Sequence, residues 1–573
     1  MLWVEDKYDE NLVDALSKKL SVSLTLSKFL YARGITTPEK ANAFLNPKLA
    51  HLSDPFDIDG MTEAVDRVIY AIGNKENILL VGDYDVDGIT STVIVKKNLI
   101  ALGLTPLHVT PKRKNEGYGL THEILERGLK LAKINLVIAL DCGTNSQKEA
   151  EELESKGIDL IIVDHHQTKE IFQTKAIQVN PHLHEDQGEP WRFLCTAGLA
   201  FKLVHGILKK LRQQGDKKAL EINPKDSLAL AGLGTIADLV TLCDENRILA
   251  KFGLKELGHN PGPGLGAILE QAKLNMESNP CSEDVAFKIA PRINACGRLD
   301  HAEVATSLLL ETDPTKSREL AQKMNEYNEE RKRIESELSE DALKQAKEHF
   351  NGRSAVVVCG QGSHWNPGVV GIVAGKLANS LGKPCIVLAQ TGNECKGSGR
   401  GVKGVNLVDT LGQCKELLEH WGGHPAAVGL SLTIDKLELF KEKFVRVIEK
   451  DSGGSFPEPS IRIATVIKKE DLQESLLLDL NNLAPFGQEN TEPILAIQKI
   501  RLAYEPKKVG SGEHFQFSIH NGRRTISGIA WNMSERIPPS TTDIDLAFRF
   551  RWNSWNGRKT PQMILEDWRI SEG

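Results

Sequence analysis

Residues 78–88 read Ile-Leu-Leu-Val-Gly-Asp-Tyr-Asp-Val-Asp-Gly, an apolar run that ends in a cluster of acids between two glycines. Two later apolar runs also end on an acid, since residues 136–140 precede Asp141 and residues 160–163 precede Asp164. Helix-like segments separate the three runs. Short apolar strands that alternate with helices predict a parallel, doubly wound α/β sheet, whose ligands bind outside the carboxyl ends of the strands. We therefore expect these acids to form one site.

Length and composition limit the class of protein. The chain has 573 residues and a mass of 63.2 kDa, which corresponds to roughly three domains. A content of 40% hydrophobic and 26% charged residues is typical of globular proteins and excludes general disorder. The formal net charge of −6 excludes a uniformly basic surface, but it permits a local basic patch.

Cysteine usage and the first residues indicate the compartment. The nine cysteines form no Cys-x-x-Cys pair, and this usage is typical of a reducing compartment rather than a disulfide framework or a zinc ribbon. The first sixteen residues contain five acids and do not resemble a secretory signal. No stretch reaches the ~18 uncharged apolar residues that a membrane span needs. We expect a cytoplasmic protein that does not enter a membrane.

The composition and the hydrophobic periodicity of the sequence change several times along the chain. Asp313-Pro314 begins a polar segment with a thin apolar stripe, which predicts a long helix that links two domains. Residues 451–459 have the composition of a linker, and residues 514–520 and 543–552 alternate polar and apolar with the period of strands. We predict five parts: an N-terminal helical segment (1–70), an α/β domain with the acids (71–312), a connecting long helix (313–350), a second α/β domain (351–450) and an all-β domain (460–573).

The acids and histidines have the composition of a metal site. If residues 83–87 are extended, Asp83, Asp85 and Asp87 face one side and converge on a single cation. His165 and His166 follow Asp164, and Asp238 lies in a segment that begins like a helix. Clustered carboxylates repel one another unless a cation lies between them. Mixed carboxylate and imidazole ligands suit Mn²⁺, or Mg²⁺ with fewer histidines, better than metals that prefer thiolates. Two ions held roughly 3.5–4 Å apart can catalyse phosphoryl displacement.

Simpler interpretations exist for each motif taken singly. The acids at 83–87 are also compatible with a calcium-type loop or an exposed acidic turn. A lone His-His pair is more often a surface or core feature than a ligand pair. Four acidic sites that each end a separate strand or helix favour the metal site over these interpretations.

The combination of motifs resembles the DHH phosphoesterase superfamily, and within it the RecJ family of single-strand-specific 5′→3′ exonucleases. The Asp-His-His motif at 164–166 stands between DYDVDG and DCG upstream and GTIADLV downstream. Further blocks of the family follow in the expected order: PKRKNEGYGL (111–120), PRINACGRLD (291–300), HWNPGVVGIVAGKLA (364–378), GSGRG (397–401), GGHPAAVG (422–429) and APFGQENTEP (484–493). The chain departs from many relatives at Gly401 and in the order His364-Trp365.

The resemblance implies roles for individual residues. The implied ligands of two Mn²⁺ or Mg²⁺ ions are Asp83, Asp85, Asp87, Asp141, His165, His166 and Asp238. Asp141 and Asp238 are expected to bridge the ions or to bind the second one, while Asp164 orients a ligating imidazole. Asp141, His165 and His424 are the expected catalytic residues. Because metal-bound water ionises far more readily than bulk water, no separate general base is needed.

The same resemblance implies residues that bind phosphate and the DNA strand. The residues expected to make these contacts are Arg113, Arg292, Asn294, Arg298, Ser398, Arg400, Gly423, His424, Arg549, Arg551 and Trp555. Taken singly, such an arginine is more often a surface charge or a cation at a helix end than a phosphate contact. Ser398 and Arg400 lie in a Gly-Ser-Gly-Arg turn, and Gly423 allows a close backbone approach beside His424.

The C-terminal segment carries a local basic excess. Residues 495–565 contain 11 Lys and Arg against 5 Asp and Glu, which is +6 within a chain of −6. Arg549 and Arg551 share one face of a predicted strand, and we expect Phe548 and Phe550 on its other face to be core residues. Trp555 is expected to be exposed and to stack on a base. The resemblance implies that this domain is an oligonucleotide-binding (OB) barrel.

The expected function is therefore that of a Mn²⁺- or Mg²⁺-dependent hydrolase that degrades single-stranded DNA from the 5′ end to 5′-mononucleotides, in DNA recombination and repair. The resemblance implies a monomer that cooperates with a single-strand DNA-binding protein and a RecQ-type helicase. One alternative is a small-substrate DHH phosphodiesterase acting on nano-RNA or cyclic dinucleotides. It is disfavoured because such relatives usually lack a C-terminal barrel like the one expected at residues 460–573. Another alternative is a non-catalytic RecJ-like DNA-binding scaffold, which is disfavoured because such proteins typically lose ligands and this chain keeps every acid and histidine of the site.

Overall fold

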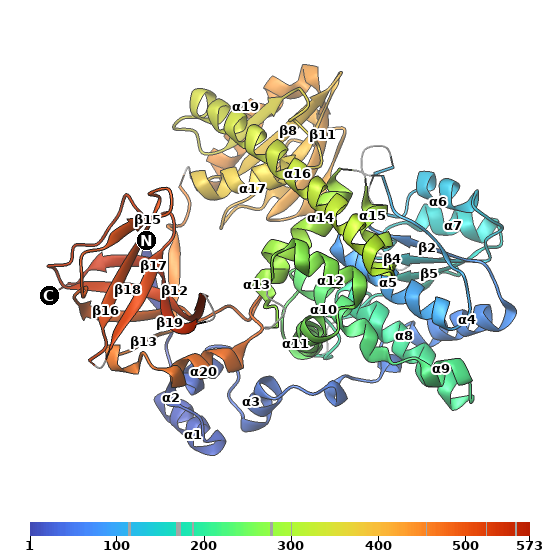
Figure 1. The fold of residues 1–573 in the computed structure, drawn as a ribbon. Coiled ribbons are helices and arrows are strands. Elements are labelled where there is room, and N and C mark those ends of the chain that lie inside the picture. The colour runs from blue at the N-terminus through green and yellow to red at the C-terminus, as the bar shows by residue number, and fades with distance from the viewer. Residues whose placement is uncertain are drawn as a thin grey trace. The chain divides into compact units, whose positions relative to one another are not determined.

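The structure is a computed structural model that describes residues 1–112, 116–117, 119–167, 173–185, 188–274, 279–299, 301–453, 455–522, 524–555 and 558–572 (Figure 1). The chain forms two compact units. The first contains residues 1–53, 239–252 and 458–573, and the second contains residues 54–238 and 253–457.

A five-stranded parallel sheet forms the first half of the second unit. Its strands are β2 (Ile78–Gly82), β3 (Leu107–Val109), β4 (Leu136–Leu140), β5 (Asp159–Val163) and β6 (Ile177–Val179). The order is β3-β2-β4-β5-β6, so the chain reverses direction across the sheet between β2 and β4. In doubly wound sheets, this reversal is where the ligand crevice lies. Every residue of β2 and β4 is buried, which explains their continuous apolar sequences.

Helices cover both faces of this sheet and confirm the doubly wound fold. On one face, α6 (His122–Leu129) and α7 (Gln147–Ser155) share a hydrophobic core with β2, β4 and β5. On the other, α5 (Val86–Ala101) and α8 (Thr196–Gln213) contact the strands and each other, and α4 (Met61–Asn74) packs on α8 (Figure 1).

A group of short helices and one long helix follow the sheet. They are α9 (Lys217–Glu221), α10 (Leu228–Ala237), α11 (Asp244–His259), α12 (Gly262–Gln271), α13 (Ser282–Asp284), a π-helix (Val285–Ile289), α14 (Ala290–Arg298), α15 (Ala302–Leu310) and α16 (Pro314–His349). The long helix predicted from Asp313-Pro314 is confirmed as α16, with the Asp313 carboxylate accepting hydrogen bonds from two backbone amides of its first turn. It contacts α12, α14 and α15 as well as α17 (Val370–Leu381), so it links the helices that follow the parallel sheet to the second α/β domain.

The second α/β domain contains a mixed sheet. Its strands are β7 (Val356–Gly360), β8 (Cys385–Thr391), β9 (Glu394–Arg400), β10 (His420–His424) and β11 (Ala427–Thr433). The order is β10-β11-β9-β8-β7, and only the β7–β8 pair is parallel. Helices α16 and α17 cover one face, and α18 (Leu407–Gly412) and α19 (Leu437–Ser452) cover the other.

The first unit is built around the C-terminal β domain. A seven-stranded sheet has the order β13-β14-β18-β19-β17-β16-β15. Its strands are β13 (Thr465–Val466), β14 (Leu495–Ile500), β15 (Lys507–Val509), β16 (His514–His520), β17 (Thr525–Ala530), β18 (Ile544–Trp555) and β19 (Arg558–Ile570). Phe548 and Phe550 are fully buried in its core, as predicted.

The N-terminal residues belong to this unit as well. The predicted helices are present as α1 (Glu10–Leu20), α2 (Leu24–Tyr31) and α3 (Pro38–Leu45), and they pack with α20 (Glu474–Leu483) on the C-terminal core. The prediction of helices alone was wrong for the first residues, because β1 (Leu2–Glu5) pairs in parallel with β12 (Ser460–Ile463). A four-residue strand whose partner is more than 450 residues away leaves no local signal.

Among the described residues, no helix has both the length and the apolar character to cross a membrane.

Candidate metal centre

Three acids directly follow three neighbouring strands of the parallel sheet. The Asp83 amide donates to the Leu140 carbonyl at 3.2 Å, and the amides of Asp141 and Asp164 continue the ladder in the same way at 3.0 and 3.1 Å. The parallel hydrogen bonding therefore fixes these carboxylates at one edge of the sheet, where the strand order reverses. Asp141 has a φ of 64°, a left-handed conformation that is costly for a residue with a side chain.

The loop after β2 differs from the extended stretch that the sequence predicted. Asp85 is the N-cap of α5 and accepts a hydrogen bond from the Gly88 amide at 3.1 Å, so Asp87 already lies in the first helical turn. The prediction that the alternate acids share one cation was based on the wrong backbone geometry. Gly88 is needed here for close packing, since a Cβ would lie 2.5 Å from the Asp83 carbonyl oxygen.

Acids and histidines form three overlapping groups, and within each group the ligand atoms lie within 4.8 Å of one another. The groups are Asp83, Asp85 and Asp141; Asp141, His165 and His166; and Asp87, His165 and Asp238. Three carboxylate oxygens surround His165 Nε2: Asp238 Oδ2 at 3.3 Å, Asp141 Oδ1 at 3.5 Å and Asp87 Oδ2 at 3.8 Å. All seven predicted ligands are thus brought together, and the sharing of Asp141 and His165 between groups fits more than one ion.

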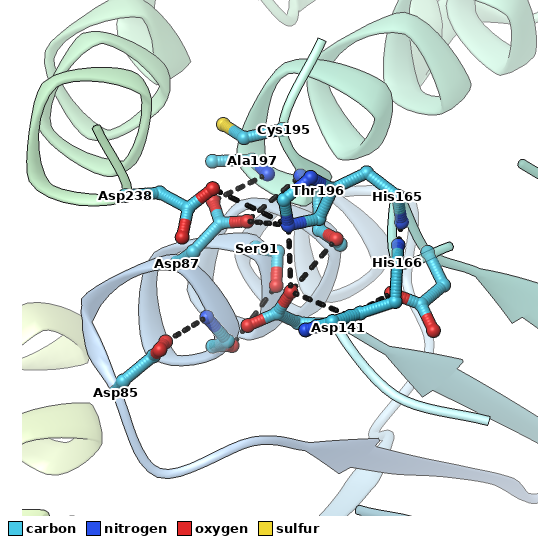
Figure 2. Close-up of polar contacts among 12 residues, drawn as sticks. Asp85, Asp87, Ser91, Asp141, His165, His166, Cys195, Thr196, Ala197 and Asp238 are labelled. Carbon is cyan, nitrogen blue, oxygen red and sulfur yellow. Dashed lines mark hydrogen bonds and ion pairs between the residues drawn. The ribbon is translucent and has the colours of Figure 1, made fainter. Parts of the chain in front are cut away.

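Asp87 is held by the beginning of α8. Its two carboxylate oxygens accept hydrogen bonds from the backbone amides of Thr196 and Ala197, both at 2.8 Å (Figure 2). The Thr196 hydroxyl donates to Asp141 Oδ1 at 3.1 Å. Gly234 of α10 lies so close that a Cβ would stand 2.8 Å from Asp87 Oδ1. None of these supporting residues is predicted from the sequence.

Asp164 fixes the orientation of His166, as predicted from the resemblance. Asp164 Oδ1 lies 2.7 Å from His166 Nδ1 and also accepts from the His165 and His166 amides. Burial lowers the pKa of His166, but the hydrogen bond and charge of Asp164 outweigh it and raise the pKa to about 9. Burial would raise the pKa of Asp164, yet its bonds to His166 and Thr144 keep that pKa well below the usual range.

Asp141 and Asp238 are buried among other acids, so their ionised forms are disfavoured in the absence of a cation. Burial and then the neighbouring charges of Asp87 and Asp85 raise the pKa of Asp141 well above its usual value. The same causes raise the pKa of Asp238 to about 9. Carboxylates crowded in this way, together with imidazole nitrogens, form a donor set that fits Mn²⁺ or Mg²⁺.

Metal binding at this site should depend strongly on pH. Asp238 and His166, each with a pKa of about 9, carry protons at neutral pH, and these must leave before the groups can bind a cation. Asp141, whose pKa is also raised, must lose its proton as well. We therefore expect Mn²⁺ affinity to rise between about pH 6 and 9, with release of at least two protons per protein at pH 7. Isothermal titration in buffers of different ionisation enthalpy measures this release. A binding enthalpy that is the same in every buffer would contradict the prediction.

Two predicted phosphate contacts lie together in the second α/β domain. Ser398 and Arg400 lie within the strand β9, so the turn predicted for this motif was wrong. Both side chains face the first turn of α17, where a Cβ on Gly371 would stand 3.3 Å from Ser398 Oγ and 3.5 Å from Arg400 Nη2. Gly423 has a φ of 137° and precedes His424, which is exposed at the end of β10. The glycine is needed at 423, because a Cβ would lie 2.4 Å from the Ala427 carbonyl oxygen.

The predicted contacts on α14 make structural hydrogen bonds. Arg292 donates to the Asn325 side chain and to the carbonyls of Lys288 and Gln271, and Arg298 donates to the Gly368 carbonyl at 2.9 Å. Asn294 is half-buried on the same helix. Arg113 lies outside the described residues.

The predicted DNA contacts of the C-terminal domain are engaged with carboxylates. Arg551 forms an ion pair with Glu492, and Arg549 lies 3.8 Å from Glu492 and 3.3 Å from Glu566. Glu492 lies just outside the segment with the basic excess, and so does Asp567, which pairs with Arg536. Part of that excess is therefore neutralised within the domain. The side chain of Trp555 lies outside the described residues.

Comparison with protein families identifies the domains. The DHH family N-terminal domain matches residues 77–235, the DHHA1 domain matches residues 351–450, and the RecJ OB domain matches residues 463–567. The fold and the acid–histidine site thus define a DHH phosphoesterase with an associated DHHA1 domain and an OB domain.

Relatives match over the whole chain. The single-stranded-DNA-specific exonuclease RecJ of Bacillus subtilis is 33% identical over 583 residues, covering 100% of this chain and 71% of the relative. RecJ of Escherichia coli is 30% identical, covering 90% and 91%. The crystal structure of Thermus thermophilus RecJ in complex with Mn²⁺ superimposes with a TM-score of 0.84 at 26% identity, covering 100% of this chain and 80% of that one. The chain belongs to the RecJ family.

Proposed function

We propose that this protein is a metal-dependent exonuclease that degrades single-stranded DNA from its 5′ end and releases 5′-mononucleotides. The observation that carries the proposal is the set of three overlapping carboxylate and imidazole groups in the DHH domain of a RecJ family member. Domain boundaries at 71–312, 351–450 and 460–573, with the N-terminal segment 1–70 and the helix 313–350, are part of the proposal.

Two Mn²⁺ or Mg²⁺ ions are the proposed cofactors, since the related Thermus thermophilus RecJ has been crystallised with each of these metals. The proposed ligands are Asp83, Asp85, Asp87, Asp141, His165, His166 and Asp238. When bound, the ions would neutralise charge on the scissile phosphate and lower the pKa of an attacking water.

The residues of the chain itself keep this site in place. Asp164 holds the His166 ring through Nδ1, which leaves Nε2 directed away from that hydrogen bond. The two amide hydrogen bonds to Asp87 and the Thr196 hydroxyl bond to Asp141 fix the two carboxylates on different elements. Such restraint lowers the reorganisation needed when charge develops in the transition state.

Ser398, Arg400 and the beginning of α17 are the proposed grip on a phosphate of the DNA. A hydroxyl, a guanidinium and a helix amino terminus are donors that suit a phosphate, and the absence of a side chain at Gly371 leaves room beside them. Gly423 and His424 are proposed to approach the scissile phosphate. Arg113, Asn294 and Trp555 remain proposed strand contacts. For Arg292, Arg298, Arg549 and Arg551, a DNA contact would have to replace or extend the bonds described above.

The partners follow from the proposed activity. Single-stranded DNA is the proposed substrate, and the protein is proposed to act as a cytoplasmic monomer in recombination and repair. A single-strand DNA-binding protein and a RecQ-type helicase are the proposed cooperating proteins, because a nuclease that needs single strands depends on proteins that expose and cover them.

Strand preference tests the proposed function. We expect Mn²⁺-dependent release of mononucleotides from a 5′-phosphorylated single strand, and release at least about a hundredfold slower from a blunt duplex of the same sequence, since a duplex end must first be unpaired at a cost of a few kcal/mol. Both substrates are followed by quantifying mononucleotides after a short incubation. A duplex with a 5′ single-stranded extension is the control, and its extension should be digested. Efficient digestion of the blunt duplex would contradict the proposal.

A further inference from the structure

The large apolar side chain with the greatest exposure among the described residues is that of Phe287, at 77%. It lies in the π-helix Val285–Ile289, and the two end residues of that helix are fully buried. The turn is thus anchored to the interior at both ends and presents Phe287 outward. A single exposed phenylalanine is ordinary. A phenylalanine presented by a π-helix is unusual, because such turns are rare and occur often at functional sites.

Pro291 explains the wide turn. In an α-helix the amide of residue 291 would donate to the Phe287 carbonyl, but proline has no N–H and its ring clashes with that carbonyl. The chain instead forms a bond of the π type from the Ala290 amide to the Val285 carbonyl. The sequence therefore builds this turn directly in front of α14.

Hydrogen bonds from Arg292 stabilise the same turn. Its guanidinium donates to the Lys288 carbonyl at 2.6 Å, to Asn325 Oδ1 on α16 at 3.0 Å and to the Gln271 carbonyl at 3.2 Å. These bonds tie the residue that follows Phe287 to two other elements. A side chain held on a rigid turn loses little conformational freedom when it binds a flat partner.

The other end of α14 packs on the loop that carries Asp83 and Asp85. Gly297 packs on the loop between Asp83 and Asp85 so closely that a Cβ would stand 2.4 Å from the Tyr84 carbonyl oxygen. From residue 297 back to Phe287 the helical segment spans about 15 Å at 1.5 Å per residue. That length corresponds to about four nucleotides stacked at 3.4 Å each. The segment is thus continuous with the acidic loop and long enough to reach past the terminal nucleotides.

We propose that Phe287 stacks on a base of single-stranded DNA, a few nucleotides from the strand end held at the metal centre. The inference rests on the proposed function and adds to it a contact that favours unpaired strands. A base within a duplex is stacked on both faces and paired on its edge, so it has no free face for the ring. Phe287 therefore contributes affinity for the strand and not to the chemical step.

Two variants at one position test this contact. We expect Phe287→Ala to weaken binding of a strand of about twelve thymidylates by about 5- to 100-fold, and Phe287→Trp to keep or improve it. Fluorescence anisotropy in EDTA measures the affinity without cleavage, so the result holds whether or not the protein proves to be an exonuclease. Cleavage of the dinucleotide pdTpdT in Mn²⁺ should be unchanged in Phe287→Ala, because this substrate is too short to reach the ring.

The control is Tyr70→Ala, which removes another exposed aromatic ring of the same unit, on α4. It should bind the longer strand like the wild type. Unchanged affinity of Phe287→Ala would overturn the proposal. An equal loss on the dinucleotide would also overturn it, because the effect would then come from damage to the metal centre. If wild type binds the strand but cleaves nothing, the proposed function fails while the stacking result still stands.

Discussion

Replacement of Asp141 by Asn is expected to reduce the release of mononucleotides at least about a thousandfold, because each metal contributes several kcal/mol to stabilisation of the transition state. Asp141 is the carboxylate shared by two of the three candidate groups, and its oxygen Oδ1 lies 3.5 Å from His165 Nε2. The amide keeps the size of the side chain and one acceptor for the Thr196 hydroxyl, but loses the charge. Single-turnover cleavage of a 5′-labelled strand in Mn²⁺ measures the loss.

The same substitution should stabilise the metal-free protein. Burial and the neighbouring acids raise the pKa of Asp141, so at pH 7 its ionised form is disfavoured in the folded state. Asn removes this cost, so the thermal midpoint of the metal-free protein should rise. The further increase in the midpoint when Mn²⁺ is added should be smaller for Asp141→Asn than for wild type. Asp159→Asn, at the amino end of β5, is the matched control and should leave cleavage unchanged. Full activity of Asp141→Asn would refute the site.

Replacement of Arg247 by Met is expected to destabilise the first unit by about 3 kcal/mol. Arg247 is buried on α11 and donates to the Phe44 carbonyl near the end of α3, and to three carbonyls at the end of α20: Asn482, Leu483 and Ala484. It thus caps two helices at once, and its guanidinium also lies 3.7 Å from the centre of the Phe44 ring. Burial lowers its pKa only to about 9, so it remains a cation at pH 7.

Hydrogen exchange of peptides from α3 and α20 measures this loss, because opening of the unit exposes their amides. Arg501→Ala is the control in the same unit: Arg501 forms an exposed ion pair with Asp543, and its loss should cost less than about 1 kcal/mol. Protection of the parallel sheet in the second unit should not change in either variant. If Arg247→Met exchanges like wild type, the carbonyls find water instead and the capping role is wrong.

The acids of the metal centre were predictable because a parallel sheet puts the carboxyl ends of its strands at one edge. Asp83, Asp141 and Asp164 each follow an apolar run directly, so the sequence alone indicates that they meet. The two later strands and the long helix α16 were predictable for a similar reason, since continuous apolar runs and an Asp-Pro start are local signals.

Features that depend on distant contacts were not predictable in this way. The bonds from the α8 amides to Asp87 join residues more than 100 positions apart, and small residues at a helix start carry no signal of that partner. The pairing of Arg551 with Glu492 likewise makes a local count of charges misleading. The loop at residues 83–87 was predicted as extended because alternating acids are compatible both with the end of a strand and with a helix start. In the structure, Asp85 is the N-cap of α5 and Asp87 lies in its first turn.

The most direct test of metal-dependent cleavage from the 5′ end is the identity of the first product from a single strand labelled on its 5′ phosphate. In Mn²⁺, we expect wild type to release the label at once as a mononucleotide, and we expect Asp141→Asn and wild type in EDTA to release none. Labelled strands that shorten progressively while the 5′ label stays on the long fragment would contradict it, and so would cleavage by Asp141→Asn at the wild-type rate.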